Sequence, residues 1–319
     1  MRAFLALLWA AILVVAAPAY AQDAASNRRI AFTFDDVPRG AGAFFTPDER
    51  AQRLIAALRE AGVEQAAFFV TTSGLDTPDG AGGERRLAAY VAAGHVIANH
   101  SHAHLHLDAT PAPDYLADLD RAATWLKGRP GYRPWFRFPF LDEGGRDATR
   151  RDAVRAGLAA RGLRNGYVTA DGSDWHLEQL TIDAKNAGRA MDMAALRKLY
   201  LQSQMSGIAY HDALARRTLG RSPPHVMLLH ETDLAALFIA DLVAELRKDG
   251  WTIITADEAY ADAELAAAMP TVPHTSGTLT GTIAWERGVP PPYAPFWMGT
   301  EVMSLLFERN VPVKPEETK

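Results

Sequence analysis

The sequence predicts an α/β protein, a distorted (β/α) barrel of about seven parallel strands. Short apolar runs rich in β-branched or aromatic residues alternate along the chain with helical patterns, which favours a parallel sheet. The chain has no glycine-rich dinucleotide loop, so a barrel is favoured over a doubly wound sheet. Polar residues follow several of the runs, as expected where the carboxyl ends of barrel strands meet on one face.

The predicted elements alternate from residue 29 onward. Strands are expected over 29–34, 65–70, 95–98, 135–138, 164–169, 225–229 and 251–255. Helices are expected over 47–61, 84–93, 113–127, 146–160 and 234–248, with a short helical turn over 257–261. Glycines directly follow three of these helices and are typical helix stops: Gly62, Gly94 and Gly250.

Three parts of the chain are expected. Residues 1–21 resemble a signal peptide, with Arg2, an apolar run and the small-x-small site Ala19-Tyr20-Ala21. Residues 22–262 form the barrel, with an insertion over about 176–224. Residues 263–319 form a tail rich in proline and aromatic residues that we expect to pack on the barrel. An exported bacterial protein, periplasmic or secreted, is therefore expected, with no integral membrane segment after cleavage.

The lack of cysteine and the balance of charges exclude some classes of protein. The chain has no cysteine, and 33 basic residues face 38 acidic ones without a basic stripe. Disulfide-stapled modules are excluded, and nucleic acid is not an expected partner. Neither composition nor pattern indicates the oligomeric state.

Two motifs point to a metal-dependent hydrolase. Thr33-Phe34-Asp35-Asp36 ends an apolar strand, and His100-Ser101-His102-Ala103-His104 follows 64 residues later. If the second stretch is helical, His100 and His104 lie on one face. Asp36 with these two histidines makes a three-ligand site, which leaves Asp35 for base chemistry. Each motif alone also fits a helix cap or a polar turn. We leave His102 and His106 out of the ligand set.

Further polar residues fall at or just after predicted strand ends: Arg137, Asp171 and His230. In a barrel these positions converge with the two motifs. Arg137 alone could be a rim salt bridge, and His230 alone could be a core histidine.

In these residues the chain resembles the NodB-homology polysaccharide deacetylases, carbohydrate esterase family 4. Five segments occur in the family's order over about residues 30–260. They are Thr33-Phe34-Asp35-Asp36, His100-Ser101-x-x-His104, Arg137-Phe138-Pro139-Phe140, Asp171-Gly172-Ser173-Asp174-Trp175 and Leu228-Leu229-His230. Two departures are Val37, where the family commonly has glycine, and Phe140, where it has tyrosine.

The resemblance implies a role for each matching residue. Asp35 would be the general base, oriented by Arg137, and His230 the acid for the leaving amine. Asp36, His100 and His104 would bind a divalent metal, most commonly zinc, with cobalt or another transition ion possible. A carboxylate of the fourth segment, Asp171 or Asp174, would raise the pKa of His230, and Asp171 is favoured because it directly follows the strand. The Phe140 N–H would hold the oxyanion, while Leu228 and Trp175 would line an acetyl pocket.

The expected reaction is metal-dependent removal of N-acetyl groups from an acetylated amino sugar of a poly- or oligosaccharide. Chitooligosaccharide, peptidoglycan and exopolysaccharide are the substrate types that the resemblance implies. Two alternatives stay open. One is an O-acetyl esterase of the xylan type, and the other is a catalytically silent carbohydrate-binding protein on the same fold.

Overall fold

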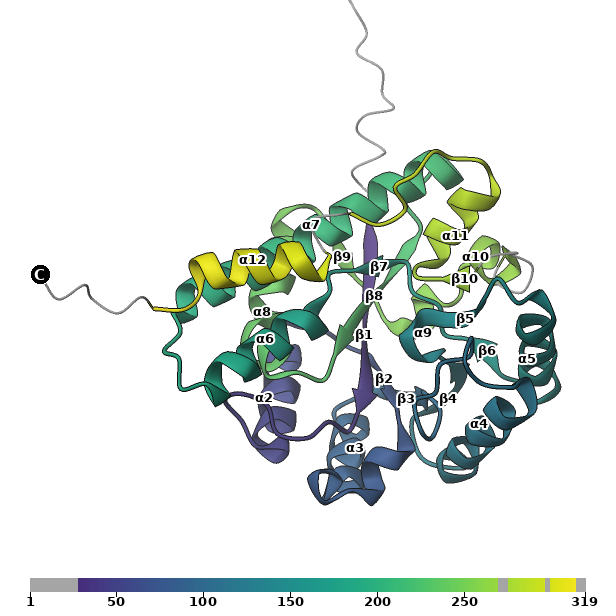
Figure 1. Ribbon diagram of the computed structural model, residues 1–319, viewed down its shortest axis with the longest axis horizontal. Helices are drawn as coiled ribbons and strands as arrows, with labels where there is room; N and C mark the ends of the chain where they lie inside the picture. Colours follow the sequence, from purple (N-terminus) through teal and green to yellow (C-terminus); the bar gives the residue numbers. More distant parts are fainter. Residues whose placement is uncertain (1–27, 269–274, 296–298, 314–319) are drawn as a thin grey trace, which may run out of the picture.

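The computed structural model describes residues 28–268, 275–295 and 299–313, and it shows one curled parallel sheet surrounded by helices (Figure 1). The sheet has the order β6-β4-β3-β2-β1-β8-β7, with β9 paired to β1 beside this path. The strands are β1 (Arg29–Val37), β2 (Ala67–Val70), β3 (Val96–Asn99), β4 (Tyr132–Phe136), β6 (Arg164–Asn165), β7 (Ala170–Asp171), β8 (Pro224–His230) and β9 (Thr252–Ile253). The predicted distorted barrel of parallel strands is confirmed.

The two edge strands of this sheet lie on one short stretch of chain. β6 pairs with β4, and β7 pairs with β8. Between them, the Gly166 N–H donates to the Phe136 carbonyl at 2.7 Å and the Thr169 N–H donates to the Val226 carbonyl at 3.0 Å. A Cβ on Gly166 would lie 2.6 Å from the ring of Phe69, so the crossing needs glycine. The strand predicted over 164–169 is therefore two short pairings, because this segment leaves one edge and joins the other.

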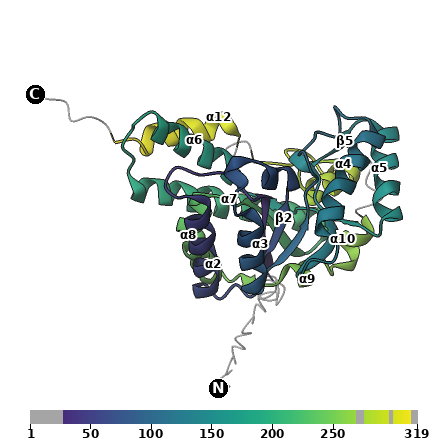
Figure 2. The ribbon, with the colours of Figure 1, turned by 90° about the horizontal axis from the view of Figure 1, so that it is seen from below.

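Helices cover the outer face of the sheet, close to their predicted positions. They are α2 (Pro47–Glu60), α3 (Gly83–Ala92), α4 (Ala112–Leu126), α5 (Ala148–Ala160), α8 (Asp233–Lys248) and α9 (Ala256–Ala259). Thr46 begins α2 with a capping box to Glu49, and Thr232 caps α8. Helices α2 and α8 pack side by side (Figure 2).

Strand side chains alternate between two apolar cores. Phe32, Phe34 and Phe68 point outward into the layer shared with the helices. Ala31 and Phe69, one residue away in each strand, belong to the cluster that fills the barrel interior. This alternation leaves the carboxyl ends of the strands as the place where polar side chains gather.

The segment after β7 and the tail form further helices beside the barrel. Two helices occupy the predicted insertion, α6 (Asp174–Asn186) and α7 (Met193–Leu219). The tail adds α10 (Ala263–Ala268), α11 (Leu279–Glu286) and α12 (Thr300–Asn310). Helix α11 contacts α7, and α12 lies along α6 and α7 (Figures 1 and 2). The short strand β10 (Thr275–Ser276) pairs antiparallel with β5 (Asp142–Gly145). Three 3₁₀ turns complete the order: η1 (Thr72–Asp76), η2 (Pro78–Gly80) and η3 (Pro139–Leu141).

The signal peptide over 1–21 lies outside the described residues. Among the helices of the described ranges, none combines the length and apolar character that a membrane crossing requires.

Candidate active site

A bulge at the end of β1 turns two adjacent aspartates toward one site. Simple alternation would place Asp35 on the inner face of the barrel and send Asp36 outward. The pairing of β1 with β2 shifts register between Phe34 and Val37, and Asp36 has a φ of 62°. A bulge of this kind re-aims a side chain at the end of a strand. Asp35 is buried, whereas Asp36 is partly exposed.

The two predicted ligand histidines lie in a loop after β3, so the helical arrangement considered for this stretch is not the one formed. Ser101 and His104 have φ values of 69° and 55°. The His102 N–H donates to Asp118 at 2.9 Å, and the His104 N–H donates to Ser101 Oγ at 2.9 Å. These side-chain acceptors take backbone donors that a helix would pair internally. The loop still brings His100 and His104 together.

Asp36, His100 and His104 converge as the sequence predicted. Asp36 Oδ1 lies 3.0 Å from His104 Nε2 and 3.4 Å from His100 Nε2. His100 Nδ1 lies 2.8 Å from the Arg137 carbonyl oxygen, which can only accept a hydrogen bond. In the neutral ring this contact places the proton on Nδ1 and the lone pair of Nε2 toward Asp36. One carboxylate and two imidazoles directed at one point fit a divalent transition metal.

The neighbouring histidines point elsewhere. His102 Nδ1 lies 2.9 Å from Thr72 Oγ1. The His106 ring stacks on Phe140, with 3.5 Å between ring centroids. His106 also forms a second, more exposed group of metal-ligand type with Asp108 and Asp142.

The charge of Asp36 is strongly favoured by its surroundings. Burial alone would raise the pKa of Asp36, but its interactions with the protonated rings of His100 and His104 outweigh it and hold the pKa well below its ordinary value. Arg39, which the sequence reasoning missed, contacts Asp36 Oδ2 at 2.8 Å. Its backbone N–H is anchored on Glu231 at 2.9 Å. Its position three residues after Asp36 was the sequence signal from which this ion pair could have been predicted.

Asp35 pairs with a fully buried arginine. Arg137 Nη1 lies 2.9 Å and 3.1 Å from the two carboxylate oxygens of Asp35. Arg137 Nη2 donates to Thr33 Oγ1 at 3.2 Å, and Nε donates to the Gly166 carbonyl. Burial lowers the pKa of Arg137, but Asp35 and Tyr260 outweigh it and raise the pKa above its ordinary value. The guanidinium therefore stays charged and fixed in position.

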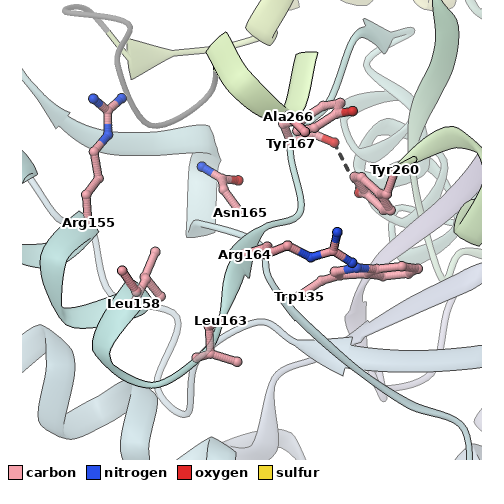
Figure 3. A pocket seen from close by; sticks show the side chains of 10 residues that line it. Trp135, Arg155, Leu158, Leu163, Arg164, Asn165, Tyr167, Tyr260 and Ala266 are labelled. Atoms are coloured by element: carbon pink, nitrogen blue, oxygen red, sulfur yellow. Dashed lines mark hydrogen bonds between the residues drawn. The ribbon is translucent and has the colours of Figure 1, made fainter. Parts of the chain in front are cut away.

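Tyr260 holds Arg137 from the side away from Asp35. Arg137 Nη2 donates to the Tyr260 hydroxyl at 2.9 Å. That hydroxyl donates to the Tyr167 carbonyl at 3.1 Å, the contact that is dashed in Figure 3. Tyr260 also lines a largely apolar cavity of about 180 Å³ with Trp135 and Leu158 (Figure 3). This cavity contains none of the predicted catalytic residues or metal ligands. Tyr260 gave no sequence signal, because it ends a short helix far from every motif.

His230 pairs with Asp174, which decides between the two candidate carboxylates. His230 Nδ1 lies 2.8 Å from Asp174 Oδ1, and the His230 N–H donates to Asp174 Oδ2 at 2.8 Å. Burial would lower the pKa of His230, but Asp174 and, less strongly, Asp36 raise it to about 9. Asp171 was favoured over Asp174 as the carboxylate paired with His230, and this prediction is wrong. Asp171 instead accepts the Ser173 N–H at 2.7 Å, within the turn that leads into α6.

The proposed substrate-contacting residues surround the same hollow. A cavity of about 390 Å³ is lined by Asp35, Asp36, His100, His104 and His230. Its remaining lining comprises Arg39, Phe140, Leu141, Asp171, Trp175, Gln179 and Leu228. Phe140 and Trp175 are half exposed, with 53% and 42% of their surface accessible, while Leu228 is buried. Arg137 lies behind this cavity and reaches it through Asp35.

Backbone strain is concentrated around this cavity. In the described ranges, six non-glycine residues have positive φ: Asp36, Ser101, His104, Phe140, Leu141 and Ser173. They lie in the bulge of β1, the loop after β3, the turn η3 and the turn before α6. Such conformations persist where surrounding contacts enforce them, and they are enriched at functional sites.

A comparison with known families gives a match in the N-terminal part of the chain. Residues 22–160 match the family model described as polysaccharide deacetylase. In this segment the chain is similar to the polysaccharide deacetylases. The predicted family resemblance is confirmed by this match, which contains the first three of the five segments. No curated protein matches the sequence.

Solved structures of carbohydrate esterase family 4 and of a polysaccharide deacetylase are similar to this chain. The polysaccharide deacetylase Bc1974 from Bacillus cereus is 17% identical, with a TM-score of 0.50, over 72% of this chain and 92% of that one. A family 4 carbohydrate esterase from Streptomyces lividans is 21% identical, with a TM-score of 0.48, over 79% and 99%. A pseudoenzyme of the same family from Bacillus anthracis is 17% identical, with a TM-score of 0.49, over 73% and 65%. At these identities the likeness concerns the fold.

Proposed function

We propose that this chain is a polysaccharide deacetylase that removes N-acetyl groups from an acetylated amino sugar of a poly- or oligosaccharide, using a divalent metal. The observation that carries the proposal is a convergence at one cavity. Asp36, His100 and His104 meet there, with Asp35 on one side and His230 on the other. Binding a sugar would require neither an oriented base nor a charged imidazole.

Zinc or another divalent transition ion held by Asp36, His100 and His104 would make water more acidic and polarise the acetyl carbonyl. Asp35 accepts a proton from the attacking water, while Arg137 keeps the carboxylate in place. The backbone N–H of Phe140 is the proposed donor to the oxyanion. Leu228 and Trp175 enclose the acetyl methyl group.

His230 supplies the proton that the leaving amine needs. Asp174 accepts from Nδ1, so the second ring nitrogen of the charged imidazole carries a transferable proton. The C–N bond then breaks, the amine departs with this proton, and acetate is the second product. Water and one amide are consumed, so the atoms balance. An amine leaves less readily than an alkoxide, and the paired histidine therefore favours the N-acetyl reaction over the O-acetyl one.

Export is part of the proposal. Acetylated structural polysaccharides lie outside the cytoplasm, and residues 1–21 have the pattern of a signal peptide. A periplasmic or secreted location would place the domain beside such a substrate.

The test is acetate release from a panel of N-acetylated and O-acetylated glycans before and after chelation, with zinc or cobalt added back. We expect release from N-acetylated chains, loss on chelation and recovery on adding metal. His104→Ala should abolish recovery, whereas the matched control His106→Ala should retain it. Release from O-acetylated glycans alone would select the esterase alternative. Glycan binding without release in any metal would select the silent binding protein.

A further inference from the structure

A second hollow continues from the candidate active site toward the C-terminal part of the chain. Its volume is about 300 Å³, and it shares Leu141 and Asp171 with the catalytic cavity. The two hollows therefore adjoin at the walls formed by these residues. Apart from Leu141, the lining comes from chain beyond residue 160, outside the segment matched by the family model. It includes Ser173, His211, Thr278, Thr282, Trp285 and Tyr293.

A buried histidine in this lining has an unused polar atom. His211 lies on α7 and is 2% exposed, and its Nδ1 has no hydrogen-bond partner among the described residues. Buried polar side chains in native proteins nearly always have a partner, so such an atom needs an explanation. Burial lowers the pKa of His211 to about 4, which leaves the ring neutral at pH 7. A neutral imidazole offers one donor and one acceptor, as a sugar hydroxyl requires.

A tryptophan adds an aromatic surface to the lining. Trp285 on α11 has 49% of its surface exposed and lines the hollow, together with Tyr293. A pyranose ring has an apolar face of C–H groups and a rim of hydroxyls. An indole beside hydrogen-bonding groups matches both features.

The charge of the lining favours an uncharged sugar. Among the described residues that form it, Asp171 is the one carboxylate, and lysine and arginine are absent. A ligand carboxylate placed here would meet Asp171 without a compensating cation. A neutral hexosamine meets no such repulsion.

We propose that this hollow is a subsite for a second, uncharged sugar ring, adjacent to the ring that is deacetylated. The subsite is built by α7, α11 and the turn before α6, and His211 and Trp285 are its specificity-determining residues. This proposal rests on the proposed function, since it identifies the substrate as a chain of at least two sugar residues. It also gives the C-terminal segment a role in selecting chain length.

The first test compares chain lengths. We expect kcat/KM for N-acetylglucosamine tetramers to fall about tenfold in Trp285→Ala, the size of one aromatic contact of about 1.4 kcal/mol. Activity on the single N-acetylglucosamine sugar should change less than about twofold. Trp285→Phe should retain most of the activity on the tetramer. Equal loss on both substrates, or no loss on the tetramer, would overturn the subsite.

The second test measures binding without turnover. In the Asp35→Asn background, calorimetry should show weaker tetramer binding when Trp285→Ala or His211→Ala is added. A chain carrying carboxylates on the neighbouring sugars should bind more weakly than the neutral tetramer. Tighter binding of the charged chain would overturn the assignment. If the tetramer binds in a Trp285-dependent manner but the wild-type protein releases no acetate, the proposed reaction fails and the subsite stands. If acetate is released but binding ignores both substitutions, only the subsite fails.

Discussion

On each side of the catalytic cavity a titratable side chain is held by a partner of opposite charge, but the two partners differ. On one side Asp35 pairs with Arg137, which four further groups hold: Thr33, Phe69, Tyr260 and the Gly166 carbonyl. On the other side His230 pairs with Asp174, which accepts from both its ring and its backbone N–H. The first pair contains a cation that does not titrate in the working range, and the second contains one that does.

This difference teaches which side sets the response to pH. Arg137 remains charged, so the orientation of Asp35 is constant across the neutral range. His230 loses its proton as the pH rises through about 9. Under the proposed mechanism the Asp35 side supplies a fixed base, and the His230 side determines the alkaline limit of activity.

Of the substitutions on the two sides, replacing the base Asp35 should reduce kcat the most. Asp35→Asn preserves the shape of the side chain but removes its ability to accept a proton. We expect kcat to fall by about 10²- to 10⁴-fold at every pH between 6 and 9. Steady-state acetate release measures the loss, and metal content by elemental analysis provides the control. Activity close to that of the wild type would contradict the role of Asp35.

Replacing the partner of His230 should move the pH profile. Asp174 raises the pKa of His230, so Asp174→Asn should shift the alkaline limb of kcat/KM toward lower pH. The activity lost should be about tenfold or more at pH 8 and smaller at pH 6. A matched Asp171→Asn variant should move the limb much less, because Asp171 interacts with His230 through its charge, whereas Asp174 also accepts hydrogen bonds from it. An unchanged limb in Asp174→Asn would remove His230 from the proton-transfer role.

The same pair predicts a stability effect with a defined sign. The folded pKa of His230 is raised above the unfolded value of 6.5, so its stabilisation is complete below that pH. It declines as the pH rises through about 9. Thermal unfolding should therefore show a larger Tm decrease for Asp174→Asn at pH 6 than at pH 10. An equal decrease at both pH values would show that the charge of His230 does not contribute.

The smallest expected effect on catalysis comes from the support behind the base. Tyr260→Phe leaves a buried Arg137 N–H and the Tyr167 carbonyl without their hydroxyl partner. We expect a loss of about 1–3 kcal/mol in the free energy of unfolding, measured with urea. The decrease in kcat should be smaller than for Asp35→Asn, because the other groups still hold Arg137. A decrease as large as that of Asp35→Asn would place Tyr260 in the chemistry itself.

The barrel and the meeting of the site residues at its strand ends could be predicted from the sequence, because both follow from simple periodicity. Long buried strands such as β1 and β8 are nearly continuous apolar runs, and their ends are marked by Asp35 and His230. Parallel packing then brings these ends together. Periodicity could not reveal that residues 164–171 divide between two sheet edges, because barrel closure depends on the whole sheet.

Local backbone geometry accounts for the other differences. His100 and His104 have helical spacing, yet side-chain acceptors such as Asp118 hold their stretch as a loop. Asp171 directly follows a strand, but the left-handed turn at Ser173 directs Asp174 toward His230. Positive φ at a residue other than glycine has no reliable sequence signal, because tertiary contacts impose it. Arg39 was missed because its ion pair depends on this same kind of loop.

The most direct test of the central claim is anomalous scattering from a crystal loaded with zinc or cobalt. We expect one fully occupied ion in bonding contact with Asp36, His100 Nε2 and His104 Nε2, and Asp35 should not coordinate it. Full occupancy at His106, Asp108 and Asp142 instead, with Asp36 still paired to Arg39 and the two histidines empty, would contradict the account.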